Sequence, residues 1–534
     1  MTLKKVKREN IHIVNKNRGI NMNIKRILEK IRKNWHYLLF MVVLVILNYY
    51  FLYDNIIQKI ETPLFIGIIF IFIFIVEVIL SYLIRKMLDK GKPLEQIFLT
   101  IAIPLGTLYM LVFPIAGTPD EIAHYYRSYE ISMGHVTSQF KDGLGGREMP
   151  RAVSQVFEDL VDDIAHIKYE EVIDTLKIKT DPNDKVFIDF STSALYSPLC
   201  YLPQAIGIAV GRILHLPTTL TFYTGRLANF ACFLAIIYFA FKYMPIKKNS
   251  VLCLLLLPIV FQAAVSLSPD ALTIAVTFAL ISFVLYMKYT KKGLMTNKEF
   301  ALMGVLCLFM SMLKIVYLPI CFLIFLIPKE RFKNNKDKYI KTIGILLVAI
   351  LINLVWLAYS SKFLIESNPG VNSGEQVKFI LTHPISYLKI LVDTITDNYL
   401  TYVMTGMGSS LGWLNIYINQ SYLFLYLILV IFVVITDQDK KKNLKEGEKW
   451  WVALLIIGVI TLIFTSLYVQ WNPVKNNMIG GVQGRYFIPV ALMGILLIGN
   501  KVKFDLNKRM NYITTFIIFF NVYTIIECLL FHLN

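Results

Sequence analysis

The sequence predicts an all-α, polytopic integral membrane protein, and three observations carry that prediction. Hydrophobic residues make up 56% of the 534 residues, above the share in ordinary soluble domains. Apolar runs approaching the ~20 residues of a membrane helix recur along the chain. Lys and Arg, which give the net charge of +18, gather in the N-terminal tail and in short loops between these runs. That distribution fixes membrane orientation, so we expect a lipid bilayer and no nucleic acid as partner.

The apolar runs predict a helical bundle with about 13 spans. They lie at residues 35–53, 64–84, 97–115, 222–241, 250–266, 271–287, 299–313, 315–328, 339–359, 416–435, 450–468, 485–499 and 511–531. Several are shorter than the ~20 residues that a straight span needs, so their ends are predicted only to within a turn.

Charge predicts the orientation of the bundle. The tail, residues 1–34, is basic and is expected in the cytoplasm. Counting spans from there places every basic loop inside, provided that residues 196–214 do not cross the membrane. That stretch carries Pro198, Pro203 and Arg212, so we predict an interfacial or re-entrant helix on the outer face.

The predicted organisation has four parts along a multi-pass chain of the cell membrane. They are the tail 1–34, the first three spans in 35–116, an outer loop with interfacial helices in 117–221, and the remaining spans in 222–534 with outer loops 360–415 and 469–484. The charged stretch 143–189 is expected to be a solvated insert. The first apolar run lacks a small-residue cleavage site, so no cleavable signal peptide is expected.

The sequence contains none of the common motifs for disulfide frameworks, zinc sites or hydrolase active sites. The six cysteines have no CxxC spacing, which predicts neither a disulfide framework nor a zinc site. Motifs for nucleotide hydrolysis, zinc proteolysis and serine hydrolysis are missing as well.

The first candidate site is the acidic pair Asp120 and Glu121, which lies where a long apolar run ends. Thr118 suits a helix N-cap, Pro119 suits the first helical position, and Glu121 completes a capping box. Asp120 in the first turn also suits the helix dipole. A helix start alone therefore explains all four residues.

A second explanation of the acidic pair is chemical. His124 and Arg127 follow Asp120 at helical spacing on one face, which a cap does not require. A carboxylate at the membrane surface can act as a base toward an incoming hydroxyl group. Catalysis or ligand binding is thus the competing hypothesis, and both stay open.

Three basic side chains, Arg226, Lys314 and Arg485, are predicted at the outer ends of spans. Arg485 follows the glycine-rich segment 480–484, and a guanidinium there can clamp a phosphate bidentately. Lys314 divides two apolar stretches, and ionisable groups at such depth are functional candidates. The alternative for Arg485 and Lys314 is anchoring, because Lys and Arg side chains snorkel to the lipid headgroups. For Arg226 the alternative is interface packing.

Two more polar residues, Tyr196 and Asp270, lie in predicted outer segments. Tyr196 opens the interfacial stretch, and Asp270 follows Ser268 and Pro269 in a short turn. Interface packing explains the first equally well, and a helix cap explains the second.

Together these motifs resemble a family of predicted bacterial membrane proteins, known mainly as a domain of unknown function, within the GT-C superfamily of polytopic glycosyltransferases. The matching stretches are 119–121 with His124, Arg127 and 129–134; 196–211; 268–270; and 481–486. Their order is similar to that in aminoarabinose transferases and protein O-mannosyltransferases, where an Arg-Leu pair, here Arg226-Leu227, opens a later span. The chain departs from the superfamily in having two spans before the one that leads into the acidic motif.

The resemblance implies a polyprenyl-phosphate sugar donor, a glycan acceptor on the outer face and inversion at the anomeric carbon. By that resemblance Asp120 or Glu121 is the base. Arg485, with Lys314 or Arg226, is expected to hold the donor phosphate. The residues expected to bind substrate are His124, Arg127, Tyr196, Asp270, Gln483 and Tyr486. Some GT-C enzymes use a divalent cation, Mg²⁺ or Mn²⁺, and others use basic side chains, and the sequence leaves both open.

Three other functions compete with a glycosyltransferase. A transporter or flippase for lipid-linked saccharides is expected to have broken helices with polar residues near the bilayer midplane. The polar motifs gather instead at one interface, which favours an enzyme. A polysaccharide polymerase or ligase shares the donor type and topology, and a non-catalytic scaffold leaves the clustered basic residues unexplained.

Overall fold

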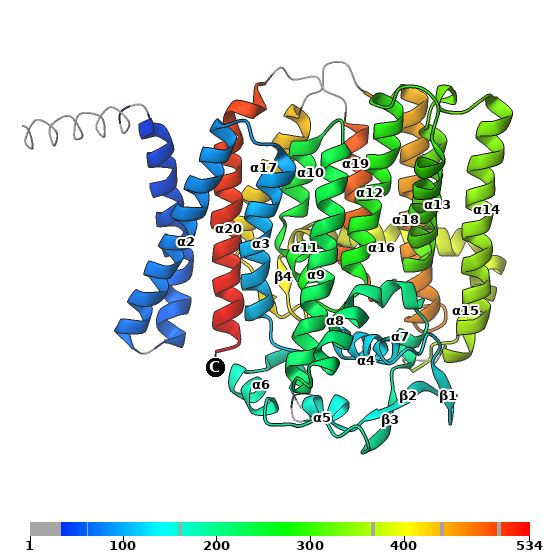
Figure 1. The fold of residues 1–534 in the computed structure, drawn as a ribbon, viewed down its shortest axis with the longest axis horizontal. Helices are drawn as coiled ribbons and strands as arrows, with labels where there is room; N and C mark the ends of the chain where they lie inside the picture. The colour runs from blue at the N-terminus through cyan, green and yellow to red at the C-terminus, as the bar shows by residue number, and fades with distance from the viewer. Residues whose placement is uncertain are drawn as a thin grey trace, which may run out of the picture.

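A bundle of long, roughly parallel helices forms the body of the protein, with shorter crosswise helices and a small sheet at one end (Figure 1). The computed structural model describes residues 32, 34–60, 62–158, 160, 163–364, 369–437, 443–498 and 504–533. The predicted basic tail lies almost entirely outside the described residues.

Eight helices of the described chain are long and apolar enough to cross a membrane. They are Asn34–Lys59, α2 (Pro63–Asp89), α3 (Leu94–Val112), α9 (Thr218–Tyr243), α12 (Asp270–Tyr289), α14 (Asn335–Ser360), α18 (Glu446–Gln470) and α20 (Met510–Phe531). Each coincides with a predicted span, so the multi-pass helical class is confirmed.

The predicted number of about 13 spans is not reached by helices of this length. The stretch 250–266 is a broken pair, α10 (Lys248–Leu255) and α11 (Pro258–Val265), bent by 65°, which makes nine spans if counted as one within the described residues. The others are shorter: α13 (Asn297–Leu313), the 3-10 helix η3 (Ile315–Leu326), α17 (Gln420–Thr436), and the run of η6 (Gly484–Phe487), α19 (Ile488–Gly494) and η7 (Ile495–Leu497). Hydropathy predicted the apolar runs correctly, but prolines interrupt some of them: Pro258 follows the bend and Pro319 lies inside η3.

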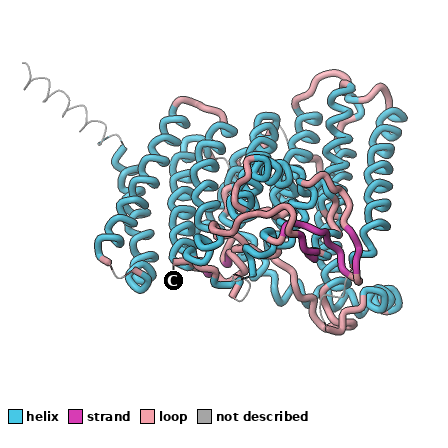
Figure 2. Tube along the Cα trace, turned by 60° about the horizontal axis from the view of Figure 1, so that its bottom comes forward, coloured by secondary structure: helices cyan, strands magenta, loops and turns pink. Residues whose placement is uncertain are grey.

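The insert that follows α4, predicted as solvated, contains strands that the sequence did not predict. β1 (Gln139–Lys141), β2 (Leu144–Pro150) and β3 (Lys185–Asp189) form an antiparallel sheet in that order. Asp142 and Gly143, both at positive φ, make the two-residue turn between β1 and β2. In Figure 2 the strands lie over the end of the bundle.

The insert is not merely solvated, because it has an apolar core. That core includes Phe157 of α5 (Ala152–Glu158), which packs against Tyr125 and Phe222 with ring centroids 5.8 and 6.0 Å away. The insert is thereby fixed to α4 (Glu121–Ser132) and to the start of α9.

The predicted interfacial stretch 196–214 forms the 3-10 helix η2 (Pro198–Tyr201) followed by α8 (Leu202–Ile213). With 12 residues, α8 extends only ~18 Å, too short for a ~30 Å hydrocarbon layer. One face of α8 packs against the protein, where Ile208 is buried, and the other face leaves the apolar side chains of Ile206 and Ile213 64% and 75% exposed. These features agree with a helix that does not cross the membrane.

Candidate functional site

The chain reverses between α3 and α4 through two residues in the left-handed region, Ala116 at φ 61° and Asp120 at φ 63°. α4 therefore begins at Glu121, with Asp120 as the N-cap residue and no side-chain cap. The predicted capping box of Thr118 and Glu121 is wrong. The backbone turns here instead, with the Glu121 amide donating to the Thr118 carbonyl at 3.3 Å.

Glu121 and Arg226 form a fully buried ion pair. Arg226 Nε donates to Glu121 Oε1 at 2.8 Å and Arg226 Nη2 donates to Oε2 at 2.6 Å, so the contact is bidentate. Both side chains are 0% exposed. Two paired charges in a dry interior need further hydrogen bonds to offset their desolvation.

The remaining donors and acceptors of this sealed pair are also occupied. Arg226 donates to the carbonyls of Phe113 at 2.6 Å and Pro114 at 2.7 Å, and the Leu267 amide donates to Glu121 Oε1 at 3.1 Å. The pair therefore joins the end of α3, the start of α9 and the turn before α12. This geometry leaves Arg226 no free donor for a phosphate and Glu121 no access to an acceptor.

Asp120, the neighbour of Glu121, faces a different environment. Its side chain is 64% exposed and lies 3.8 Å from Arg485 Nη2. Arg485 Nε lies 3.4 Å from Asp270 Oδ2, and Lys314 Nζ lies 2.5 Å from Asp270 Oδ1. We call Asp120, Asp270, Lys314 and Arg485 the open cluster. It brings together two carboxylates and two cations from four segments far apart in the sequence.

An aromatic ring supports the two cations of the open cluster. The Tyr486 ring centroid lies 5.2 Å from Lys314 Nζ and 5.4 Å from the guanidinium carbon of Arg485. The Tyr486 carbonyl in turn accepts from the Tyr317 hydroxyl at 2.9 Å. Tyr486 thus contributes to the site through its ring.

His124 lies beside the open cluster on α4. Its Nδ1 is 2.8 Å from the Tyr201 hydroxyl, and its ring lies 5.9 Å from that of Tyr196. Burial lowers the pKa of His124 to about 4, against the opposing influence of Asp120. His124 is therefore neutral at physiological pH. Tyr196 also lies near the cluster, and a substrate-binding role for either residue stays a prediction.

Arg127, by contrast, does not contact the open cluster. It pairs with Glu130 and donates to Ser138 Oγ at 3.2 Å and to the Val136 carbonyl at 2.9 Å, all away from Asp120. Glu130 Oε1 also accepts a hydrogen bond from Arg147 Nε of β2 at 2.6 Å. Arg127 and Glu130 therefore connect the strand-bearing insert to α4, and the i,i+3 spacing of the two residues was the sequence signal for that role.

The glycine-rich approach to Arg485 has a packing explanation. A Cβ on Gly484 would lie 2.1 Å from the Gly406 amide nitrogen, so only glycine lets η6 approach α16 (Pro384–Met407) this closely. Gln483, just before it, has a buried Oε1 without a hydrogen-bond partner. The close packing of Gly484 against Gly406 thus positions Arg485.

A small polar pocket lies next to the open cluster. Thr118 and Pro119 form one wall, α11 with Gln262 forms another, and Asp270 with Arg485 borders it. The space between these side chains is about large enough for one water molecule. Sequence reasoning missed Thr118 and Gln262 as lining residues, because one was explained as a cap and the other lies within an apolar run.

No group of three or more His, Cys, Asp and Glu residues in the described part of the chain is arranged to hold a metal ion. The two carboxylates of the open cluster each face a cation instead. Lys314 and Arg485 are therefore the groups at hand for an anionic ligand.

Comparison with known proteins identifies the family of the chain and does not assign it an activity. No curated protein and no solved structure matches the chain. One family model matches residues 104–493, which include every residue of the open cluster and leave out Asn34–Lys59, α2 and α20. The match covers well over half of the chain, and the chain belongs to the family described as "Predicted membrane protein (DUF2142)".

Proposed function

We propose that this protein is a membrane glycosyltransferase of the GT-C type. It transfers a sugar from a polyprenyl-phosphate donor to a glycan acceptor on the outer face, with inversion. One observation carries the proposal: exposed Asp120 lies beside Arg485, and Arg485 converges with Lys314 on Asp270. A base next to two cations is what displacement of a lipid phosphate requires.

Asp120 acts as the base. The acceptor hydroxyl oxygen attacks the anomeric carbon while the bond from that carbon to the phosphate oxygen breaks on the opposite face. Asp120 takes the hydroxyl proton, and the lipid phosphate leaves with the bonding electrons. Glu121, the other candidate for this role, is sealed against Arg226, and this contrast favours Asp120.

Lys314 and Arg485 hold the donor phosphate and stabilise the charge that develops on it. Asp270 is their internal counter-ion and keeps both cations close together before the donor binds. Arg226, the third predicted phosphate ligand, is a structural residue in this proposal.

The outer-face location is supported by charge at the two ends of the bundle. Lys248 Nζ lies 3.7 Å from Glu95 Oε2 at the start of α3, whereas the end of α3 touches the sealed pair beside the site. Lys288 near the end of α12 pairs with Glu448, whereas Asp270 at the start of α12 is in the open cluster. Basic loops thus lie at the end opposite to the site, in agreement with the positive-inside rule.

A transfer assay tests the proposal. The purified full-length protein in nanodiscs is given radiolabelled polyprenyl-phosphate hexoses together with membrane glycans of its host. We expect labelled glycan with inverted linkage from the wild type, and a rate lower by ~10²- to 10⁴-fold from Asp120→Asn.

Asp142→Asn is the matched control. Asp142 is also exposed and at positive φ, but it lies at the tip of the β1–β2 turn. Its rate should equal that of the wild type. Full activity of Asp120→Asn would rule out the proposed base, and no transfer from any donor by the wild type would rule out the enzyme.

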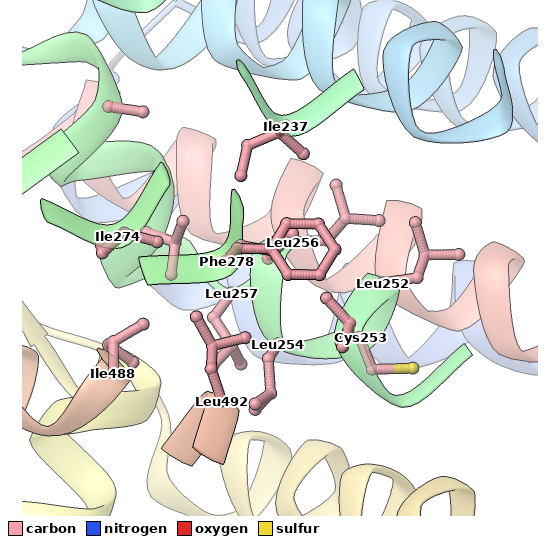
Figure 3. Close-up of a cluster of buried hydrophobic side chains, with 14 of the residues drawn as sticks. Ile237, Leu252, Cys253, Leu254, Leu256, Leu257, Ile274, Phe278, Ile488 and Leu492 are labelled. Carbon is pink, nitrogen blue, oxygen red and sulfur yellow. The ribbon is translucent and has the colours of Figure 1, made fainter. Parts of the chain in front are cut away.

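The broken pair α10–α11 favours one second candidate, a transporter or flippase, because broken helices mark many transporter sites. Its surroundings argue against a substrate path. The Leu256 carbonyl at the break accepts from Asn521 Nδ2 at 3.0 Å and from the Tyr426 hydroxyl at 3.2 Å. Figure 3 shows the break among apolar side chains, Phe278 and Leu492 among them.

Two measurements separate the alternatives. Translocation of a fluorescent lipid-linked saccharide in proteoliposomes, without transfer, would favour the flippase. Transfer of long chains rather than single sugars, read from product size, would favour a polymerase or ligase.

A further inference from the structure

Thr118 carries a hydroxyl group that nothing in the fold accounts for. The residue is 3% exposed, and its Oγ1 has no hydrogen-bond partner among the described residues. It does not cap α4, since Asp120 holds that position. A buried hydroxyl without a partner is unfavourable in a folded protein, so a group from outside the chain is expected to meet it.

The Thr118 side chain borders the pocket beside the open cluster. Most of the residues that line the pocket are polar: Thr118, Gln262, Ser266, Ser268, Asp270 and Arg485. The space is small, enough for a water molecule or one hydroxyl group and too small for a whole sugar ring.

Most other polar groups of the lining are already engaged. Gln262 Oε1 accepts from the Gly412 amide at 2.9 Å, and its Nε2 donates to the Gly412 carbonyl at 3.3 Å. Ser266 Oγ donates to the Ala263 carbonyl at 3.1 Å, and Ser268 Oγ accepts from the Asp270 amide at 3.2 Å. In the lining, the buried side-chain atoms that lack a hydrogen-bond partner are Thr118 Oγ1 and Arg485 Nε, and the second of these is in an ion pair with Asp270 at 3.4 Å.

We propose that this pocket is a subsite for one hydroxyl group of the sugar that the donor carries, and that Thr118 Oγ1 binds it. The inference rests on the proposed function, because it takes the donor phosphate to lie at Arg485. The sugar is bonded directly to that phosphate, so its ring must lie close to the Arg485 guanidinium that holds the phosphate. The pocket borders the same Arg485 and offers a free hydroxyl there, which makes Thr118 a residue that determines sugar specificity.

Binding of short donor analogues tests the subsite without requiring an acceptor. The full-length protein in nanodiscs is titrated with citronellyl phosphate and with its glucose, galactose and mannose phosphodiesters, and affinity is measured by calorimetry. We expect at least one hexose to bind more tightly than citronellyl phosphate. Thr118→Val should lower the affinity for that hexose phosphodiester by ~3- to 10-fold, the effect of one neutral hydrogen bond. The affinity for citronellyl phosphate should not change.

Two variants control for the substitution itself. Thr118→Ser keeps the hydroxyl group and should bind as the wild type does. Thr107→Val removes an exposed hydroxyl of α3 that donates to the Ile103 carbonyl at 2.8 Å, far along the helix from the pocket, and should change neither affinity. Equal melting temperatures for Thr118→Val and wild type show that folding is intact.

Each other outcome overturns the inference in a distinct way. Equal affinities for citronellyl phosphate and all three hexoses would leave a phosphate site without a hydroxyl subsite. Unchanged hexose binding by Thr118→Val would show that the pocket holds only a water molecule. No binding of citronellyl phosphate by the wild type would remove the phosphate site, and with it the proposed function.

Discussion

Two adjacent carboxylates, Asp120 and Glu121, belong to opposite kinds of site. Glu121 lies in a sealed pair with Arg226, where every nitrogen of the guanidinium has a partner. Asp120 is exposed and meets Arg485 only loosely, at 3.8 Å. A sealed pair fixes the fold and a loose one can exchange partners. The comparison shows that two neighbours in sequence can be assigned separate roles once their partners are known.

The largest expected effect comes from opening the sealed pair. Glu121→Gln leaves the Arg226 charge buried without its counter-ion, and loss of one partner of a buried pair costs about 3–5 kcal/mol of stability. We expect a large fall in melting temperature and in membrane accumulation, measured by fluorescence-detected size exclusion after heating.

The control for Glu121→Gln is Glu148→Gln in β2. Glu148 is 60% exposed and lies 3.9 Å from Lys141, and such a surface pair contributes little. Its melting temperature should stay close to that of the wild type. The double variant Glu121→Gln/Arg226→Met should recover part of the loss, since the unpaired charge is gone. Stable Glu121→Gln protein without transfer activity would instead point to a catalytic Glu121.

An intermediate effect is expected from the cations of the open cluster. Lys314→Met removes one charge-assisted contact to the donor phosphate, so we expect citronellyl phosphate to bind ~10- to 100-fold more weakly. Lys362→Met is the control: Lys362 is exposed and stacks on Tyr359 without joining the cluster. Equal weakening by both variants would indicate a general loss of positive charge rather than a site.

The features of the fold that depend on residues close together in the sequence were predictable. The apolar runs are local, and each of the eight long helices was predicted from hydropathy. The Asp142-Gly143 turn was also a local signal, and it would have predicted the β1–β2 hairpin had it been weighed against the charge of the segment.

The partners of the charged residues were not predictable, because they are distant in sequence. Arg226 lies 105 positions from Glu121, and nothing nearby distinguishes it from Arg485. Arg226 and Arg485 each lie near the start of an apolar run, at a predicted outer surface. The sequence therefore predicted the acidic and basic residues of the site together, but it could not tell the sealed pair from the open cluster.

The smallest expected effect is the pH dependence contributed by His124. Burial sets its pKa at about 4 in the folded protein, below the ordinary value of 6.5. Between these values the unfolded chain binds a proton that the folded chain does not, so this contribution to stability is present above pH 6.5 and is lost as the pH falls toward 4. The transfer rate should show no inflection near pH 6.5 from this residue.

His124→Gln isolates that contribution, because glutamine keeps a polar partner for the Tyr201 hydroxyl and does not titrate. We expect the melting temperature of the wild type, relative to His124→Gln, to fall steadily from pH 7 to pH 4.5. The charged groups that face His124, which are Asp120, Asp270, Lys314 and Arg485, are present in both proteins. A constant difference over this range would mean that water reaches His124 in the folded protein and that its pKa is not lowered by burial.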